Sequence, residues 1–493
     1  MKNIIKIFIG IFLIVSLFGC SDEYFDVDKP STAVNLEDLR MNDILGPSIY
    51  HTVKAQYYAE RSLGNYSQYI TGQSGGAVGS SSASEAWTQI YLYAIPNLKV
   101  ILAKAEEKNA KHFSGVAKVL MAMNLGLATD SWEWVPYTEA AQGVENLQPA
   151  FDSQEAIYTE IDALLAQAII ELQGVDDSGI SVGIEDLIYG GNIDNWIKAA
   201  YTLRARYALH LNKKNGAAAF DSALSFLANG FTSNSDDFQM NFEEKNMNPW
   251  FAREILARAT SNDHDKIGDQ LVSYMNGTSY PFVDGLVTID PRLPIYGENG
   301  GAITDPWRGF VSGGEGESSD GEDANVNFVD GGFYTTLDAP IVMISYAEAL
   351  FIKAEAEFIK NGGNTTSTGS NANAYNAYID GIAANMAKMG VSGADYIADS
   401  AIGVTDAGLK LEHIMKEKYI ANFLNPETYV DLRRYDFSTD VFRDLALPVS
   451  HLDSEYPNEW MLRAIYPASE ESRNPTSVNA HKQAPTTPVW WDQ

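Results

Sequence analysis

Apolar residues recur at three- and four-residue steps along much of this 493-residue chain, which limits it to a fold built mainly from amphipathic helices. Between residues 153 and 172 the apolar stripe comprises Ile157, Ile161, Leu164, Leu165 and Ala168. The same spacing predicts helices over residues 43–58, 85–109, 113–129, 192–211, 217–227, 265–275, 345–360, 374–389, 409–423 and 429–435. We therefore expect a mostly α protein.

Successive helices joined by short connections pair as antiparallel hairpins of about 34 residues, each unable to bury its apolar face alone. This favours a tetratricopeptide-like scaffold, in which the helix pairs stack in the same geometry although the tetratricopeptide consensus sequence is absent. An irregular α domain is the alternative. Trp87 and Trp196 lie on apolar helical stripes, so we expect both in the core.

Turn-forming residues replace the helical pattern from about residue 232 to residue 344. We interpret 232–344 as a loop-rich insertion with a few short strands. It separates the first part of the helical scaffold, 43–231, from the second part, 345–493, whose end from residue 447 is expected to be mostly coil.

The N-terminus has the layout of a secretory signal peptide, with Lys2 and Lys6 before an apolar run, Ile7–Phe18, and a cleavage site at Gly19-Cys20. That run is too short for a spanning helix, which needs about 20 residues. Cys20, the only cysteine, lies at the cleavage site, and the arrangement resembles a bacterial lipobox. We expect residues 1–19 to be removed, Cys20 to be lipidated and residues 20–42 to form a tether; an incidental cysteine is the alternative.

Without residues 1–19, 32 basic residues stand against 65 acidic ones, so the net charge is −33. Such a surface repels nucleic acid and argues against a nucleic-acid partner. It tolerates neutral ligands such as sugars or peptides.

Five further segments resemble, in order, the motifs of the SusD/RagB family of outer-membrane nutrient-binding lipoproteins, in its SusD-like second branch. They are Asp130–Ala140 (DSWEWVPYTEA), Asp290–Tyr296 (DPRLPIY), Ser345–Glu357, Leu411–Tyr435 (with Asp431-Leu432-Arg433-Arg434) and Arg463–Asn474 (RAIYPASEESRN). In the first of these, Glu133 and Trp134 stand where the family usually has Gly-Asp.

This resemblance implies a tetratricopeptide-like scaffold with a loop-rich second region, and a lipid-anchored protein at the cell exterior. It also implies a TonB-dependent, SusC-like transporter as partner, to which the protein delivers oligosaccharides or peptides, with glycans favoured. We expect Arg292, Arg433 and Arg434 to form structural ion pairs in this fold.

Ligand contacts are expected on loops, since a rigid scaffold displays its chemistry there. Sugar rings stack on aromatic side chains, and their hydroxyls pair with amides and carboxylates. The candidates at the mouth of the Gly/Ser-rich stretch 66–83 are Tyr66, Gln68, Tyr69 and Gln73; those in the insertion are Trp307, Arg308, Phe310, Tyr280, Tyr296 and Tyr334. Trp307 is the first choice, because it lies between Pro306 and Arg308-Gly309 and on no apolar stripe.

Residues 316–330 are rich in oxygen ligands, namely Asp320, Glu322, Asp323, Asn325 and Asn327. They do not follow the EF-hand order, so a solvated acidic loop is favoured over a calcium site, and we expect no cofactor. The sequence has no nucleophile elbow, HExxH or phosphate loop, and we expect no enzyme. A surface glycoside hydrolase and an adhesin-like structural protein remain as alternatives.

Overall fold

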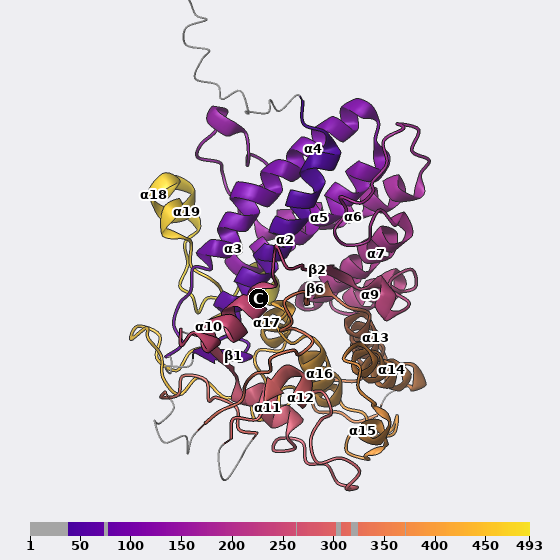
Figure 1. Ribbon diagram of the computed structural model, residues 1–493, viewed down its shortest axis with the longest axis vertical. Helices are drawn as coiled ribbons and strands as arrows, with labels where there is room; N and C mark the ends of the chain where they lie inside the picture. Colours follow the sequence, from indigo (N-terminus) through magenta and orange to yellow (C-terminus); the bar gives the residue numbers. More distant parts are fainter. Residues whose placement is uncertain (1–37, 73–76, 263, 302–306, 317–323, 370) are drawn as a thin grey trace, which may run out of the picture.

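Long amphipathic helices build the first part of the chain (Figure 1). The structure, a computed structural model, describes residues 38–72, 77–262, 264–301, 307–316, 324–369 and 371–493. The helices of the first part are α2 (Met41–Leu63), α3 (Ser84–Thr88), α4 (Ile95–Lys108), α5 (Lys111–Trp132), α6 (Gln154–Gln173), α7 (Ile193–His210), α8 (Asn212–Asn215) and α9 (Ala217–Leu227).

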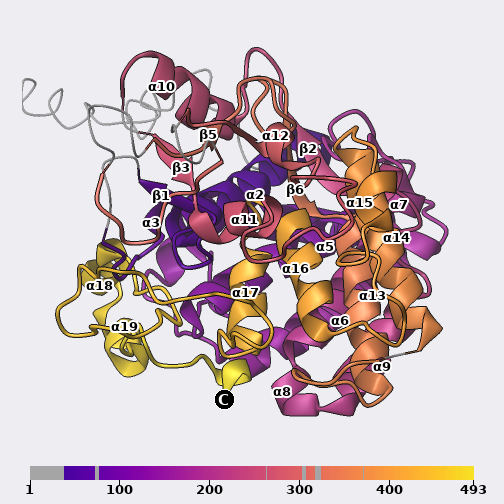
Figure 2. The ribbon, with the colours of Figure 1, turned by 90° about the horizontal axis from the view of Figure 1, so that it is seen from below.

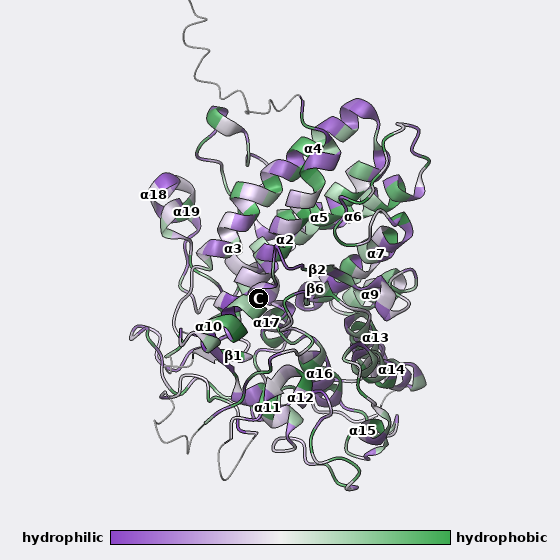
Figure 3. Cartoon of the chain, in the orientation of Figure 1, coloured by the Kyte–Doolittle hydropathy of each residue, from purple (hydrophilic) through white to green (hydrophobic). Residues whose placement is uncertain are grey.

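Helix α5 is the centre of this part, and it is buried almost all round. It packs against α4 on one side and α6 on the other, as expected of consecutive antiparallel hairpins. Gly126 allows close packing on α7, because a Cβ atom there would lie 2.2 Å from the Tyr207 hydroxyl oxygen. Figure 3 shows both hydrophobic and hydrophilic residues along α4, which covers the core from outside.

The predicted helix over residues 85–109 is interrupted by a π-helical turn, η3 (Gln89–Ala94), between α3 and α4. Pro96 explains the position of this turn, since proline cannot donate to a preceding carbonyl and is accommodated in the first turn of a helix. In the structure it stands in the first turn of α4. Trp87 and Trp196 are buried, which confirms their assignment to the core.

Short elements and turns fill the middle of the chain. The strands are β1 (Ile70–Gly72), β2 (Phe238–Asn241), β3 (Asp265–Ile267), β4 (Gly297–Glu298), β5 (Asn327–Phe328) and β6 (Pro340–Ile344). The helical elements are η5 (Asn234–Asp236), η6 (Phe251–Leu256), α10 (Ala257–Ala259), α11 (Asp269–Met275) and α12 (Leu293–Tyr296). One antiparallel sheet has the order β1-β3-β5-β4, with Ile70 opposite Ile267, and the second pairs β2 with β6.

The prediction of a helix over the whole of residues 265–275 is wrong at its start. Asp265–Ile267 forms β3, which pairs with β1 almost 200 residues earlier in the chain, and the helix begins only at Asp269. A three-residue strand of this kind depends on a distant partner, which local periodicity does not reveal.

The last part returns to helices: α13 (Tyr346–Lys360), α14 (Ala372–Lys388), α15 (Ala394–Ala398), α16 (Leu411–Ala421), α17 (Glu427–Arg434), α18 (Ala468–Arg473), α19 (Pro475–His481) and the 3-10 turn η7 (Trp490–Asp492). Helix α13 packs on α14, on α16 and on α7 and α9 of the first part. Figure 2 shows α18 and α19 beside α3, on the side opposite α13 and α14.

One large hydrophobic core runs through the helical parts and the loop-rich middle, and a smaller cluster lies between α7, α9 and α13. The expectation of a mostly α, helical-hairpin fold with few short strands is therefore confirmed. No helix in the described part of the chain has the length and apolar content of a membrane span.

Candidate functional site

The segment 307–310 is held against the four-stranded sheet by main-chain hydrogen bonds. The Phe310 N–H donates to the Ile267 carbonyl at 2.9 Å, and the Asp269 N–H donates to the Phe310 carbonyl at 2.8 Å. Gly309 allows this approach, because a Cβ atom there would lie 2.4 Å from the Cα of Asp269. The main chain that carries the first-choice candidate is therefore fixed in place.

Trp307 and Arg308 are the two described candidates whose side chains are half-buried rather than buried. The Nδ2 of Asn276 donates to the Trp307 carbonyl at 2.9 Å. Arg308 donates from Nε to Oδ1 of Asn325 at 3.2 Å, and Asn325 is itself buried. An indole ring next to an anchored guanidinium provides an apolar face and several N–H donors, which suits a sugar ring.

The other candidates of the insertion lie in the interior. Tyr296, Phe310 and Tyr334 are 1%, 2% and 6% exposed. The Tyr296 ring stacks on Phe423 with centroids 4.9 Å apart, and Tyr334 meets Phe423 edge-on at 5.4 Å. Tyr280 is also buried, under the guanidinium of Arg443. These rings join the loop-rich middle to the chain around α16 and present no open face to a ligand.

Tyr66, Gln68 and Tyr69 are buried too, with their polar atoms bonded inside the fold. The Tyr66 hydroxyl donates to the Gly79 carbonyl at 2.8 Å and accepts from the Ser81 N–H at 2.7 Å. Gln68 donates to the Ala446 carbonyl at 2.7 Å. Tyr69 is hydrogen-bonded to the Tyr419 carbonyl and the Thr428 hydroxyl. In this structure they position the ends of the Gly/Ser-rich stretch.

Several predicted residues lie outside the described part of the chain. They are Cys20, Gln73 and the three acids of the calcium hypothesis, Asp320, Glu322 and Asp323. Of the two remaining calcium candidates, Asn325 accepts from Arg308, and Asn327 belongs to β5. Among the described residues, no group of three His, Cys, Asp or Glu side chains is placed to hold a metal ion.

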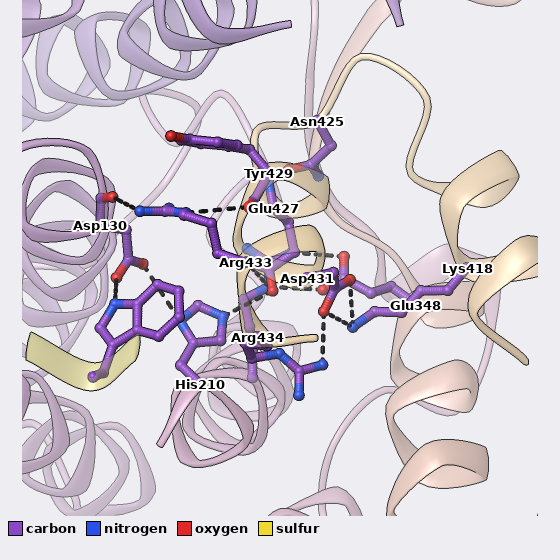
Figure 4. A network of polar contacts seen from close by, with 12 residues as sticks. Asp130, His210, Glu348, Lys418, Asn425, Glu427, Tyr429, Asp431, Arg433 and Arg434 are labelled. Carbon is purple, nitrogen blue, oxygen red and sulfur yellow. Dashed lines mark hydrogen bonds and ion pairs between the residues drawn. The ribbon is translucent and has the colours of Figure 1, made fainter. Parts of the chain in front are cut away.

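Helix α17 is held in place by a buried polar network, drawn in Figure 4. Arg434 donates from both terminal nitrogens to the Glu355 carboxylate and, at 2.7 Å, to Oδ1 of Asp431. Lys418 pairs with the other oxygen of Asp431 at 2.8 Å. The expectation that Arg434 makes structural ion pairs is confirmed.

Arg433 differs from that expectation, since it donates to main-chain carbonyls instead of pairing with Asp431. Its acceptors are the carbonyls of Asp130 at 2.8 Å, Leu462 at 3.0 Å and Tyr429 at 3.2 Å. The reason is position on the helix: neighbouring residues point about 100° apart, so Arg434 meets α13 while Arg433 faces the end of α5. Arg433 thus ties three distant segments together.

His210 is buried in the same network between two carboxylates. Its Nε2 lies 2.8 Å from Oε1 of Glu427, and its Nδ1 lies 3.3 Å from Oδ2 of Asp130. Burial alone would lower the pKa of His210, but the charges of Glu427 and Asp130 outweigh this effect and raise it to about 9. The imidazole is therefore a cation of the network at neutral pH.

Arg292 joins the loop-rich middle to the second helical part. Its guanidinium pairs with Asp290 at 2.6 Å and with Glu417 of α16 at 2.7 Å, and all three side chains are fully buried. Burial alone would raise the pKa of Glu417, but Lys416 and Arg292 lower it to about 2. The predicted structural role of Arg292 is confirmed.

The comparisons with known proteins agree with this arrangement. A family model, SusD-like and described as "Starch-binding associating with outer membrane", matches residues 35–448. No protein with a curated annotation matches the chain. A chitin-binding SusD homologue from Flavobacterium johnsoniae is similar in structure, with a TM-score of 0.72 at 21% identity over 91% of this chain and 98% of that one.

Two further solved structures have the same fold. One is a SusD homologue from Bacteroides uniformis, with a TM-score of 0.70 at 20% identity over 91% of this chain and 99% of that one. The other is a SusD/RagB family protein from Bacteroides thetaiotaomicron, with a TM-score of 0.67 at 22% identity over 92% of this chain and 99% of that one. At such identities the structures show the fold, while the family model covers most of the chain. The chain therefore belongs to the SusD/RagB family, in its SusD-like branch.

Proposed function

We propose that this protein is a cell-surface lipoprotein that binds glycan oligomers and delivers them to a TonB-dependent transporter in the outer membrane. The observation that carries the proposal is the family match over residues 35–448, because that family is described as starch-binding and associated with the outer membrane. Two structurally similar proteins are described as chitin-binding. The net charge of the mature chain also favours neutral ligands.

Within this function, Trp307 and Arg308 form the primary contact. They come from a loop whose main chain is fixed, and their half-buried side chains pair an aromatic surface with a cationic donor. A pre-positioned aromatic side chain loses little conformational entropy when it binds a ligand. Gln73 is retained as a candidate contact from the Gly/Ser-rich stretch.

The lipid on Cys20 supplies the membrane attachment. The first described residue, Asp38, stands 18 positions after Cys20 in the sequence. The end of the molecule where α2 begins is therefore held near the bilayer, at the top of Figure 1. The loop-rich middle lies at the opposite end, where it is free to receive a ligand.

Isothermal titration of the mature chain with Cys20→Ser tests the binding function. The panel contains maltose and chitin oligomers, xylan oligomers and short peptides. We expect saturable binding of one glycan class without product formation, and about tenfold weaker binding in Trp307→Ala, which corresponds to about 1.4 kcal/mol. Trp490→Ala, another half-buried tryptophan, is the matched control and should bind as the parent does.

Each alternative gives a different result in the same experiment. Binding of peptides alone would indicate a peptide-binding member of the family. Release of shorter sugars would indicate a surface glycoside hydrolase, and mutation of two carboxylates would then abolish it. Absence of binding to the whole panel would favour a structural surface protein. Co-purification of the lipidated chain with an outer-membrane transporter tests the delivery step. The proposal does not require the Cys20→Ser variant to lose that complex.

A further inference from the structure

A pocket of about 330 Å³ lies where the chain after α17 meets the C-terminal segment. Its volume falls at the lower end of the range for small-ligand sites, about 300–1,000 Å³. Its lining includes Asp436, Phe437, Asn458, Glu459, Trp460 and Thr486. None of them belongs to the site assigned above, and the sequence pattern marked most of this region only as coil.

Two parallel aromatic rings form one wall of the pocket. The rings of Phe437 and Trp460 are stacked with centroids 4.3 Å apart and an angle of 9°. Phe437 is 5% exposed, while Trp460 is half-buried. The Trp460 ring is thus supported from the protein side by Phe437, and this support fixes its orientation. A fixed aromatic surface at a pocket suits the apolar face of a sugar ring.

The indole N–H of Trp460 makes no hydrogen bond within the described residues. Three of the four fully buried tryptophans, at 132, 196 and 491, behave differently, since each donates its indole N–H to a protein oxygen. A half-buried Trp460 with an unused donor is therefore available to a hydroxyl group in the pocket.

Three side chains around the pocket are also unused. Asn458, Glu459 and Thr486 make no side-chain hydrogen bond or ion pair among the residues that the structure describes. Together they offer an amide, a carboxylate and a hydroxyl, the groups that pair with sugar hydroxyls in both donor and acceptor roles. A few polar groups that converge on an apolar wall are typical of ligand sites.

The backbone at the pocket is strained in a way that the fold maintains. Asp436, Phe437 and Asn458 have φ values of +51°, +52° and +64°. This region is rare for non-glycine residues, and a bulky residue such as Phe437 is an outlier there. Phe437 is held by its N–H bond to the Leu432 carbonyl at 2.9 Å. Strain of this kind concentrates at functional sites.

The pocket is connected to the primary contact through the main chain. The Val449 N–H donates to the Ser312 carbonyl at 2.9 Å, which joins the segment leading to Asn458 to the loop that follows Trp307. Behind the pocket, Trp460 and Glu459 reach a small cavity that Tyr66 and Val78 also line. The pocket therefore borders the Gly/Ser-rich stretch.

We propose that this pocket is a second glycan subsite, which binds one or two sugar units. The sugar packs its apolar face against Trp460 and directs hydroxyls to the Trp460 N–H, Asn458, Glu459 and Thr486. This inference rests on the proposed function, because it assigns the same class of ligand. Two subsites on one chain raise the apparent affinity for an oligomer that spans both, without any stronger single contact.

The experiment is ¹⁹F NMR of the mature chain labelled with 5-fluorotryptophan, titrated with disaccharides of the same glycan panel up to about 20 mM, since weak single-site affinities are near 1 mM. Trp460→Phe assigns the Trp460 resonance. We expect that resonance to shift saturably with the bound sugar, and the Asn458→Ala/Glu459→Gln double variant to weaken this titration at least fivefold. The matched control is Asn215→Ala/Glu155→Gln, in a groove of comparable size beside Trp490, and it should change nothing.

The outcomes separate this inference from the proposed function. If a sugar shifts other tryptophans while the Trp460 resonance stays fixed, the second subsite is refuted and glycan binding stands. If the Trp460 resonance shifts equally in the double variant and in the parent, the assigned contacts are wrong and the proposal is refuted. If Trp460 responds in Trp307→Ala as in the parent, the second subsite stands by itself. If no sugar shifts any resonance, both proposals fail.

Discussion

Replacing Arg292 with methionine should destabilise the whole protein, because this one side chain neutralises a buried cluster. The guanidinium donates to Asp290 at 3.0 and 2.6 Å, to Asn385 at 2.9 Å and to Glu417 at 2.7 Å. Methionine fills a similar volume and makes none of these bonds. The variant therefore isolates the loss of charge and hydrogen bonding from the loss of packing.

The size of the destabilisation depends on which hydrogen-bond and ionic partners each carboxylate retains in Arg292→Met. Glu417 retains Lys416 at 3.0 Å and the Tyr396 hydroxyl at 2.7 Å. Asp290 loses its only cationic partner among the described residues and keeps the N–H of residue 292. Breaking a buried pair on one side costs about 3–5 kcal/mol, since an uncompensated charge stays behind. Adding Asp290→Asn should recover about 1–2 kcal/mol, because a neutral amide is less costly to bury.

Urea unfolding of the mature chain measures these free energies from the midpoint and the slope. Arg61→Met is the matched control: its ion pair with Glu85 is exposed, so we expect a loss of about 0.2–1 kcal/mol. A loss below about 1 kcal/mol for Arg292→Met would contradict the reasoning. So would a double variant with Asp290→Asn that is no more stable than the single one.

Three other predictions concern the interior. His210 has a pKa of about 9 in the folded protein against an ordinary 6.5, so its stabilising effect is complete below pH 6.5 and is lost as pH rises toward 9. This loss lowers the free energy of unfolding by on the order of 3 kcal/mol between pH 6.5 and 9. His210→Gln should remove that pH dependence, which urea unfolding across this range measures. Glu60 is buried with both carboxyl oxygens unbonded among the described residues, and burial raises its pKa to about 8. Glu60→Gln should therefore raise the free energy of unfolding at pH 8, by on the order of 4 kcal/mol, and have little effect at pH 4. Gly126→Ala should cost about 1–3 kcal/mol in the same assay, because its Cβ would overlap the Tyr207 ring; an unchanged midpoint would show that α5 and α7 separate easily.

The helical part of the fold can be predicted from the sequence, because a helix with one buried face shows a local periodicity of apolar residues. In α6 the predicted stripe from Ile157 to Ala168 is buried throughout, and Ser153 caps the helix by accepting from the Ala156 N–H at 3.2 Å. Such a pattern needs only neighbours three and four residues away. The strand β3 needs β1, which is distant in sequence, and so the pattern around residue 265 predicted helix instead.

The candidate site was harder to predict, since an exposed tyrosine and a buried one look alike in sequence. Tyr66 and Tyr69 follow a helix and precede a Gly/Ser-rich stretch, which is also the context of a binding loop. In the structure their hydroxyls bond to the main chain instead. Trp307 could be separated from the others because Pro306 and Gly309 exclude a regular element around it. Trp460 could have been chosen as a loop candidate on similar grounds, because its neighbours Asn458 and Glu459 are polar and the segment is rich in proline.

The residues of the family motifs and the residues proposed to contact a ligand are different sets. Arg292, Arg433 and Arg434 are buried and hydrogen-bonded to other segments of the chain, so they specify how the loop-rich middle and α17 attach to the scaffold. Any ligand class is compatible with them, because none of them reaches the surface. The proposed ligand contacts, Trp307 and Trp460, are half-buried instead, and the scaffold does not enclose them. The fold is kept at about 20% identity to other SusD homologues, as expected where buried charges preserve the frame while exposed side chains change.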